Sequence, residues 1–342
     1  MHLIAWKDVT RPLSYGGLGI PSFDSLYHGM ACSFIWRMYT ENSLLGHWYK
    51  VKYESPWKPA IPTASKFWKL FCHVAQNIKE LIHFTIAPTC HFSFLWDPWF
   101  NGDSLAKSFT CNQLASCEVM DFISNDQWML IAYLPSDIKS NIINITIGEA
   151  PMLTWNGLSK PTAKMFKANF FSNMDTVSWA KFIWHKRFAL RFGCFAWMAI
   201  QRKLKCADIL IYRGIPVPPL CGFCIGNNET HSHLFFECDF SFTVITKLFP
   251  VLNCFYLRPN LSQTFDFFYN SQHYNALEKN FCFITISATV YFIWRERNKR
   301  RFSNSWDSPY SITAATINAI RSKVRNWKHL DKLEIRFKEI LV

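Results

Sequence analysis

The sequence predicts a mainly α-helical protein with a few short strands, in which a small Cys-Cys-His-Cys module is embedded among the helices. Apolar residues recur at helical spacing through most of the chain, and β-branched residues gather in only a few short runs. Half of the 342 residues are hydrophobic, and 32 Phe and 15 Trp supply enough apolar surface for a sizeable core. This composition argues against a disordered chain, which would contain few aromatic residues.

The N-terminal part of the sequence begins with turn-forming residues and continues as a helix. Gly and Pro are frequent over residues 11–21, which favours turns. The spacing of apolar residues predicts a helix over 23–39, capped by Asp24 or Ser25. The apolar face expected for this helix consists of Leu26, Met30, Phe34 and Met38.

A second amphipathic helix is expected directly after Ser65, whose hydroxyl suits the capping position. Its apolar stripe consists of Phe67, Leu70, Phe71, Val74, Ile78, Leu81 and Ile82. Residues 92–96 are interpreted as a short strand that ends at Asp97 and Pro98. Residues 141–148 are interpreted as another strand because they are rich in β-branched side chains.

The C-terminal part is expected to be helical on both sides of a Cys pair. Helical spacing covers 179–210 and is broken by the prolines of 216–219. A helix over 231–249 is expected to begin inside the Cys/His module, and two more follow at about 277–302 and 310–340.

We expect three segments along the chain. Residues 1–150 form a helical, Trp-rich connector region, residues 151–265 contain the Cys/His module, and residues 266–342 form basic C-terminal helices.

The strongest chemical signal is a set of four residues with the spacing Cys-x2-Cys-x8-His-x4-Cys. The set consists of Cys221, Cys224, His233 and Cys238. Zinc prefers four such ligands in a tetrahedron, and a site with four protein ligands leaves no position for a substrate water. The spacing therefore predicts one structural Zn²⁺ ion. His233 and Cys238 reach one metal only if the helix begins late or bends between them, because they are five residues apart.

Two alternatives to this ligand set stay open. His231 competes with His233 as the fourth ligand, although a capping or surface role is the more common one for such a histidine. The four residues could also be reduced core thiols and a histidine, since the chain contains 12 Cys. The start of the sequence has no secretory pattern, so an intracellular protein with reduced thiols, in the nucleus or the cytoplasm, is expected.

The chain carries a net charge of +13, and residues 291–342 contain 12 Lys or Arg and 5 Asp or Glu. Such a basic excess suits RNA or DNA as a partner. The candidate phosphate-binding residues lie beside Trp294 and Phe302 and are Arg295, Arg297, Lys299, Arg300 and Arg301. The alternative is a solvated helix end whose cations favour the negative end of the helix dipole.

Several functional classes lack their residues in this sequence. A polymerase or nuclease needs clustered carboxylates to hold two metal ions, and the chain contains no Asp-Asp pair. Nucleotide-binding loops and a Ser nucleophile motif are also missing, so neither an enzyme nor a small-molecule substrate is expected. The apolar run 281–294 is shorter than a membrane-spanning helix and is interpreted as a core helix, without a membrane partner.

The residues around the Cys/His module resemble the reverse-transcriptase zinc-binding domain of plant non-LTR (LINE-type) retrotransposon polyproteins. The residues that carry the resemblance are Cys221, Cys224, Glu229, Thr230, His233, Leu234, Phe235, Phe236 and Cys238, with Trp179, Ile183, Trp184 and Trp197 upstream. Trp6, residues 16–20, Trp36, Trp68 and Trp99 resemble the segment that follows the polymerase in these elements. Gly29 and Ser33 stand where that segment usually has Asn and Lys, which indicates a drifted copy.

The resemblance implies a closed, four-ligand zinc site and a parent protein that is an RNA-directed DNA polymerase, whose polymerase precedes the region present here. It also implies, more loosely, an accessory region that binds nucleic acid. The alternatives are a zinc-stabilised scaffold for protein interactions and a degenerate fragment without function.

Overall fold

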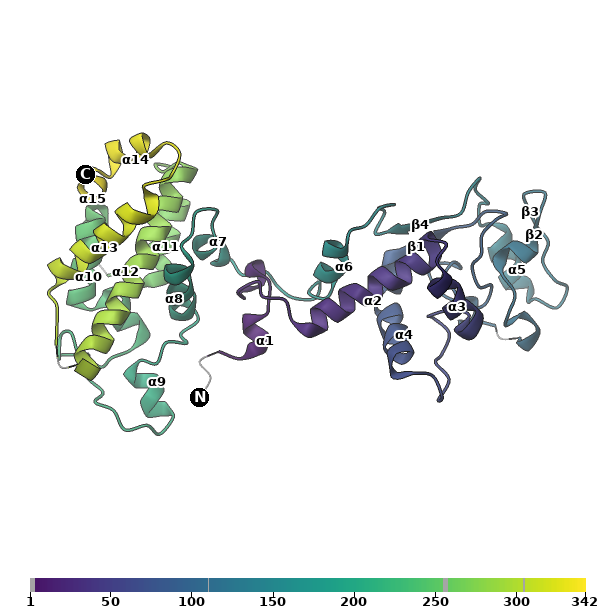
Figure 1. Cartoon of the computed structure of the whole chain (residues 1–342), viewed down its shortest axis with the longest axis horizontal. Coiled ribbons are helices and arrows are strands. Elements are labelled where there is room, and N and C mark those ends of the chain that lie inside the picture. The colour runs from purple at the N-terminus through teal and green to yellow at the C-terminus, as the bar shows by residue number, and fades with distance from the viewer. Residues whose placement is uncertain (1–3, 110, 255–257, 304) are drawn as a thin grey trace. The chain divides into compact units, whose positions relative to one another are not determined.

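The computed structural model describes residues 4–109, 111–254, 258–303 and 305–342, which form two compact units. One unit combines Met1–Ile20 with Asp175–Val342, and the other is Pro21–Met174. The protein is mainly helical with a few short strands, as predicted (Figure 1). The three expected segments, 1–150, 151–265 and 266–342, stay a prediction.

The unit Pro21–Met174 is built around helix α2 and a two-stranded sheet. Its helices are α2 (Phe23–Thr40), α3 (Leu44–Tyr53), α4 (Lys66–Ile78), α5 (Ser136–Ile143) and α6 (Ala163–Asn169). Strand β1 (Ile82–Thr85) pairs antiparallel with β4 (Met152–Trp155), and β2 (Ile123–Ser124) pairs antiparallel with β3 (Gln127–Trp128). Ser65 caps α4 as predicted, because its hydroxyl accepts a hydrogen bond from the Trp68 amide.

Helix α2 covers the predicted residues, and its predicted apolar face is right in part. Met38 is buried and Phe34 packs against the core, whereas Leu26 and Met30 are exposed. The buried face also contains small residues such as Ala31 and Cys32. Helix α6 approaches this face so closely that a Cβ on Gly29 would lie 3.2 Å from the Lys167 Cα atom. The expected cap is also wrong, because the hydroxyl of Ser22 accepts from the Ser25 amide.

Two expected strands are wrong. Helix α5 occupies the first part of the run 141–148, and Ile138 and Ile142, four residues apart, fill the core from one side of that helix. The helix begins after Pro135, a start signal that the β-branched composition outweighed. Residues 92–96 form turns, apart from a single bridge between Ser93 and Glu118.

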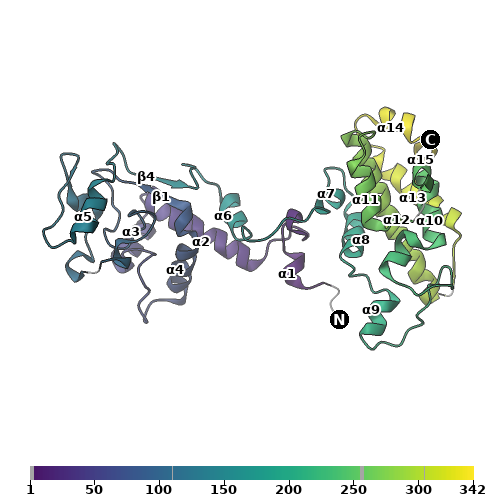
Figure 2. The ribbon, with the colours of Figure 1, turned by 180° about the vertical axis from the view of Figure 1, so that it is seen from behind.

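The other unit is a helical assembly around one long helix. Its elements are α1 (Trp6–Val9), α7 (Ala180–Ile183), α8 (Leu190–Ile200), α9 (Ala207–Tyr212), α10 (Asp239–Leu248), α11 (Leu261–Asn270), α12 (Ala276–Ser303), α13 (Pro309–Val324), α14 (Leu330–Arg336) and α15 (Lys338–Leu341). Helices α10, α11 and α13 lie beside α12 (Figure 2), and α8 packs along it. The expected last helix, 310–340, is divided into α13, α14 and α15.

Helix α12 is long and apolar enough to cross a membrane by length and composition. Two thirds of its most apolar stretch is nevertheless buried among the other helices of its unit, including Phe281, Ile286 and Ile293. This burial agrees with the interpretation of residues 281–294 as part of a core helix.

Candidate metal centre

The first two candidate ligands lie on a tight hairpin of residues 219–229. The Glu229 amide donates to the Pro219 carbonyl, and the Cys221 amide donates to the Asn227 carbonyl, both over 2.8 Å. Ile225 adopts a positive φ of 58° at the turn, and its amide donates to the Cys221 carbonyl. The hairpin therefore folds Cys221 and Cys224 toward the same side.

The second pair of ligands lies on either side of a break in the chain. Phe236 has φ 85°, outside the helical region, so the helical turn that starts at His233 does not continue into α10. The Cys238 amide donates to the His233 carbonyl over 2.8 Å, which closes this bend. The bend that one shared metal requires between His233 and Cys238 is therefore present.

The four side chains converge. The ligand atoms of Cys221, Cys224, His233 and Cys238 all lie within 4.8 Å of one another. The Sγ atoms of Cys221 and Cys238 are 3.9 Å apart, and the Cys224 Sγ lies 3.3 Å from the His233 Nε2. Zinc–sulfur bonds of about 2.3 Å in a tetrahedron separate two sulfurs by about 3.8 Å. The donor set and its spacing fit a zinc ion held by four protein ligands.

Two thiols of this cluster, those of Cys221 and Cys238, share a hydrogen bond. The pKa of Cys221 falls to about 5, mainly because its thiolate accepts a hydrogen bond from Cys238. The pKa of Cys238 rises for the complementary reason, since it holds the shared proton, and burial raises it further. A metal ion would take the place of this proton and bind the sulfurs as thiolates.

His231 is directed away from the cluster. Its ring is buried, and its Nε2 lies 2.7 Å from the Leu204 carbonyl, to which it donates. Burial lowers the pKa of His231, so the neutral ring is favoured. His233 supplies the imidazole of the cluster.

The five basic candidates of α12 have unlike surroundings. Arg297 is buried and forms an ion pair with buried Glu229, with 2.6 Å between Nη2 and Oε1. Arg300 pairs with Glu296, and Lys299 pairs with Asp307, both over 2.8 Å. The guanidinium of Arg301 donates to the Pro218 carbonyl over 3.1 Å. Arg295 is exposed and has no ion pair or side-chain hydrogen bond within the part of the chain described.

Glu229 is a residue whose role the sequence did not reveal. It is 1% exposed, and its carboxylate accepts hydrogen bonds from the Ala207 amide and from the Arg297 guanidinium. A buried carboxylate is stable in its charged form only with such partners. In the sequence, Glu229 stood out only as one of the residues that carry the family resemblance, four residues before His233. Nothing in the sequence indicated Arg297 as its partner.

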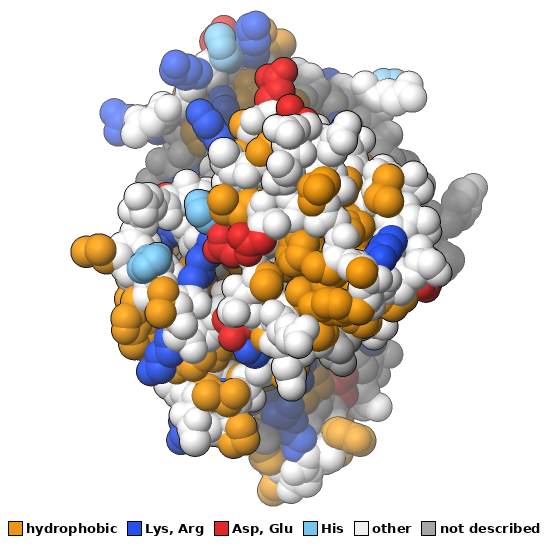
Figure 3. Space-filling view, turned by 90° about the vertical axis from the view of Figure 1, so that its right-hand side faces the viewer, with side chains coloured by type: hydrophobic (Ala, Val, Ile, Leu, Met, Phe, Trp, Pro, Cys, Tyr) orange, Lys and Arg blue, Asp and Glu red, His pale blue; other side chains and the backbone are white. Residues whose placement is uncertain are grey.

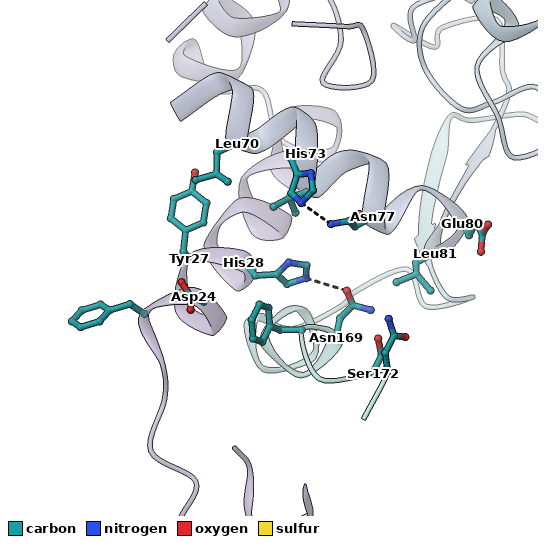
Figure 4. Close-up of a pocket in the computed structure, with 14 residues that line it drawn as sticks. Asp24, Tyr27, His28, Leu70, His73, Asn77, Glu80, Leu81, Asn169 and Ser172 are labelled. Atoms are coloured by element: carbon teal, nitrogen blue, oxygen red, sulfur yellow. Dashed lines mark hydrogen bonds between the residues drawn. The ribbon is translucent and has the colours of Figure 1, made fainter. Parts of the chain in front are cut away.

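A cavity of about 1000 Å³ in the unit Pro21–Met174 was also missed (Figure 4). His28 and Asn169 line it and are hydrogen-bonded to each other, with 3.0 Å between the Nε2 and Oδ1 atoms. His73 and Asn77, on α4, line it as well. Its lining comes from three helices and adjoining turns that are distant in sequence, so no local motif marks it.

Comparison with known proteins adds a family for part of the chain. Residues 162–244 match the family model described as zinc-binding in reverse transcriptase. The chain is also 19% identical over 279 residues to the "Putative ribonuclease H protein" of Arabidopsis thaliana, an alignment that covers 73% of this chain. The chain spans 44% of the length of that relative.

No solved structure matches the chain. The matched range contains all four clustered side chains, Cys221, Cys224, His233 and Cys238. Residues 162–244 of this chain therefore carry a zinc-binding domain of the reverse-transcriptase type, which confirms the resemblance to that domain.

Proposed function

We propose that this chain binds one structural zinc ion through Cys221, Cys224, His233 and Cys238 and serves as a nucleic-acid-binding accessory region of a retrotransposon-derived reverse-transcriptase protein. The convergent Cys/His cluster supports the zinc site, because its sulfur and nitrogen atoms have the spacing that a tetrahedral ion needs. The family match and the plant relative support a parent of the plant non-LTR type.

Nucleic-acid binding is supported chiefly by the charge of the chain around the metal centre. Residues 176–228 contain eight Lys or Arg and one Asp, a net charge of +7. Arg191 and Arg202 are exposed, and Lys203 and Lys205 are half-buried. These four side chains have no ion pair within the described ranges, so they are available for phosphates.

The proposed nucleic-acid interface therefore lies mainly outside the basic end of α12, where the sequence had placed it. Arg297, Arg300 and Arg301 bind groups of the protein itself, whereas the cations of α8 and of the segment before α9 are exposed or half-buried. We therefore assign phosphate binding to Arg191, Arg202, Lys203 and Lys205, together with Arg295 of α12.

The zinc content of the purified full-length chain tests the first part of the proposal. We expect one zinc per chain by elemental analysis, and none in the Cys221→Ser/Cys224→Ser variant. Cys111→Ser/Cys117→Ser is a matched control, because these half-buried cysteines lie outside the cluster. A folded wild-type chain prepared with zinc in the medium and lacking the metal would refute the zinc site.

The salt dependence of binding to labelled single-stranded RNA tests the second part. Arg202→Gln/Lys203→Gln/Lys205→Gln should weaken binding and reduce the slope of log K against log salt by about 2, because three phosphate contacts are lost. Lys66→Gln/Lys160→Gln/Lys164→Gln removes three exposed charges from the other unit and should leave the slope unchanged. Equal slopes in all three proteins, or no binding at low salt, would contradict the assignment.

We further propose that the region has no catalytic centre of its own. Apart from the Cys/His cluster, the described residues contain no group of three or more His, Cys, Asp or Glu placed to hold a metal. Phosphoryl transfer by two metal ions needs such a group. We therefore do not propose for this chain the ribonuclease H activity in the relative's name. We propose that the chain resides in the nucleus or cytoplasm, without a membrane partner, which accords with the proposed role.

A protein-interaction role is the second candidate, and one helix favours it. Helix α3 exposes Leu44, Leu45, Trp48 and Val51, with Leu44 93% exposed. Figure 3 shows one face of the unit Pro21–Met174, on which hydrophobic side chains gather. Exposed apolar patches of this kind often bind other proteins. The variant Leu44→Gln/Val51→Gln tests this role. The role is contradicted if the variant self-associates like the wild-type chain and captures the same partners in a pull-down experiment.

A further inference from the structure

Arg300 of α12 connects the two halves of the ligand set. Its Nη1 donates to the Gly222 carbonyl over 3.0 Å, and Gly222 lies between the ligands Cys221 and Cys224. Its guanidinium also lies 4.9 Å from the ring centre of Phe223 and 4.5 Å from that of Phe240. One cation thus contacts the first ligand loop and the residue two positions after the ligand Cys238.

The two rings beneath Arg300 are themselves stacked, with their centres 4.4 Å apart and an angle of 18° between their planes. Phe223 belongs to the Cys-x-x-Cys loop, and Phe240 belongs to α10, so their contact joins the two ligand-bearing segments. Two further hydrogen bonds hold the Arg300 guanidinium over the rings. Its Nε donates to the Glu296 carboxylate over 2.8 Å, and its Nη2 donates to the Asp307 carbonyl over 3.0 Å. Such fixed geometry suits a cation–π contact.

A buried ion pair fixes the base of the same hairpin. Glu229 ends the hairpin that carries Cys221 and Cys224, and both oxygens of its carboxylate lie within hydrogen-bond distance of the Arg297 guanidinium. The pair is almost fully enclosed, since the side chains of Arg297 and Glu229 are 3% and 0% exposed. The Nη2 of Arg301 also lies 3.5 Å from the Oε2 of Glu229, so a second arginine of α12 reaches the end of the hairpin. Outside the hairpin, Arg297 donates to the Lys205 carbonyl and Arg301 to the Pro218 carbonyl.

We propose that the basic end of α12 positions the ligands of the metal site. Arg300 keeps the Cys221–Cys224 loop and the Cys238 segment in register, and the Glu229–Arg297 pair anchors the hairpin between them. Groups that orient metal ligands raise metal affinity, because fewer conformations are lost on binding. Metal binding and the docking of the α12 end against the hairpin therefore stabilise each other.

Charge favours the same arrangement. Three thiolates and one neutral imidazole around a divalent zinc ion leave a net charge of −1 at the site. A guanidinium beside the ligand loop compensates for this charge within a partly buried environment. Lysine at position 300 would keep the charge but lose the planar, multidentate contacts.

Competition between the full-length protein and a chromogenic chelator for Zn²⁺ tests the proposal. We expect Arg300→Leu to lower zinc affinity about tenfold or more, and Arg300→Lys to lower it less. Lys279→Leu is the matched control on the same helix and should bind zinc like the wild type, because Lys279 donates to the Tyr269 carbonyl and not to the ligand loop. The absorption of bound Co²⁺ should change in Arg300→Leu and not in Lys279→Leu, because only the first substitution changes the register of the ligands.

A second variant keeps the test decisive if Arg300→Leu does not fold. Phe223→Leu removes one ring from a half-exposed position, and its loss of zinc affinity should not add to that of Arg300→Lys, since both act through one contact. Hydrogen exchange supplies the reciprocal measurement: zinc should protect the amides of 296–303 in the wild type. Additive losses, or no protection, would overturn the positioning role.

The inference rests on the proposed zinc binding, and the two can fail separately. A wild-type chain that holds no zinc refutes the zinc site itself. If the wild-type chain holds zinc and a folded Arg300→Leu variant binds it with unchanged affinity, only the positioning role of α12 is refuted.

Discussion

Phe236 determines how the ligand set closes. With φ 85° it occupies a conformation that costs a side-chain-bearing residue free energy, and its amide donates to the Ser241 hydroxyl over 3.1 Å. Its ring is fully buried, so packing can compensate for the strain. The break at this residue places Cys238 on the side of the cluster where a continuous helix would not.

His185 gives a prediction about acid stability. Its ring is buried, its Nδ1 accepts a hydrogen bond from the Arg187 amide, and burial lowers its pKa to about 4. Because the pKa in the unfolded chain is about 6.5, the unfolded state takes up a proton first as pH falls. The stability that the neutral ring contributes is complete above pH 6.5 and decreases as pH falls toward 4, by about 2 kcal/mol at pH 5.

Urea unfolding of the wild type and of His185→Gln at several pH values measures this effect. We expect the difference in unfolding free energy between the two proteins to change in favour of the variant below pH 6.5. The comparison cancels any acid loss of zinc, because the metal ligands are the same in both. Parallel pH profiles would show that His185 is not the responsible group.

At the residue scale, the sequence predicted which Cys and His side chains converge, but not the surroundings of the cations. The spacing of Cys221, Cys224, His233 and Cys238 identified the cluster because a metal site constrains the types and the separation of its residues. Nothing local distinguishes a buried arginine from a solvated one, and the partner of Arg297 lies 68 residues away at Glu229. The turn at position 222 does not require a glycine, since a Cβ on Gly222 would meet open space.

The loop of residues 9–19 is the element that attaches the N-terminal segment to α8. The Gly16 carbonyl accepts a hydrogen bond from the buried Trp197 indole over 2.7 Å, and the Leu18 amide donates to the Val9 carbonyl. A Cβ on Gly17 would lie 2.0 Å from the Arg11 carbonyl oxygen, within the backbone of the loop. The loop therefore cannot keep its shape around a larger residue at this position.

Gly17→Ala should accordingly destabilise the unit that contains the metal centre by about 1–3 kcal/mol, the range for an overpacked site. Unfolding by urea, followed by tryptophan fluorescence, measures the loss. Gly222→Ala is the control, because its added methyl group meets no atom within 4 Å. Equal stability of the two variants would mean that the loop adjusts at no cost.

Elements were predictable where a local signal acted alone. Ser65 followed by an amphipathic stripe located α4, and the long apolar pattern located α12. The buried face of α2 was predicted wrongly at Leu26 and Met30. The partner of this face, α6, is more than 120 residues further along the chain, and its close packing at Gly29 requires small residues. Helix α5 was missed because composition took precedence over the start signal at Pro135.

At the scale of the whole molecule, one unit is inserted into the other. Met1–Ile20 packs with Asp175–Val342, and the Val177 amide donates to the Ser14 carbonyl over 2.9 Å. The unit Pro21–Met174 has a core of its own, with Trp68, Phe71 and Phe94 fully buried. The family match begins at residue 162, so it includes α6 of the inserted unit. The insertion could not be predicted from local patterns, because Met1–Ile20 and Asp175–Val342 come together only in the folded chain.

An internal deletion tests whether the unit with the metal centre folds without the insertion. Residues 21–174 are replaced by a Gly/Ser linker of about ten residues, which reaches from Ile20 to Asp175 because both lie within a few residues of the Ser14–Val177 contact. We expect this variant to unfold cooperatively and to bind one zinc with the affinity of the full chain. A second variant that also lacks residues 1–20 should be less stable, because Trp197 and Ile183 lose the packing of Ile4, Val9 and Leu18. If both variants are equally stable, the N-terminal segment is dispensable and the unit is Asp175–Val342 alone; if neither folds, the inserted unit is required for the fold.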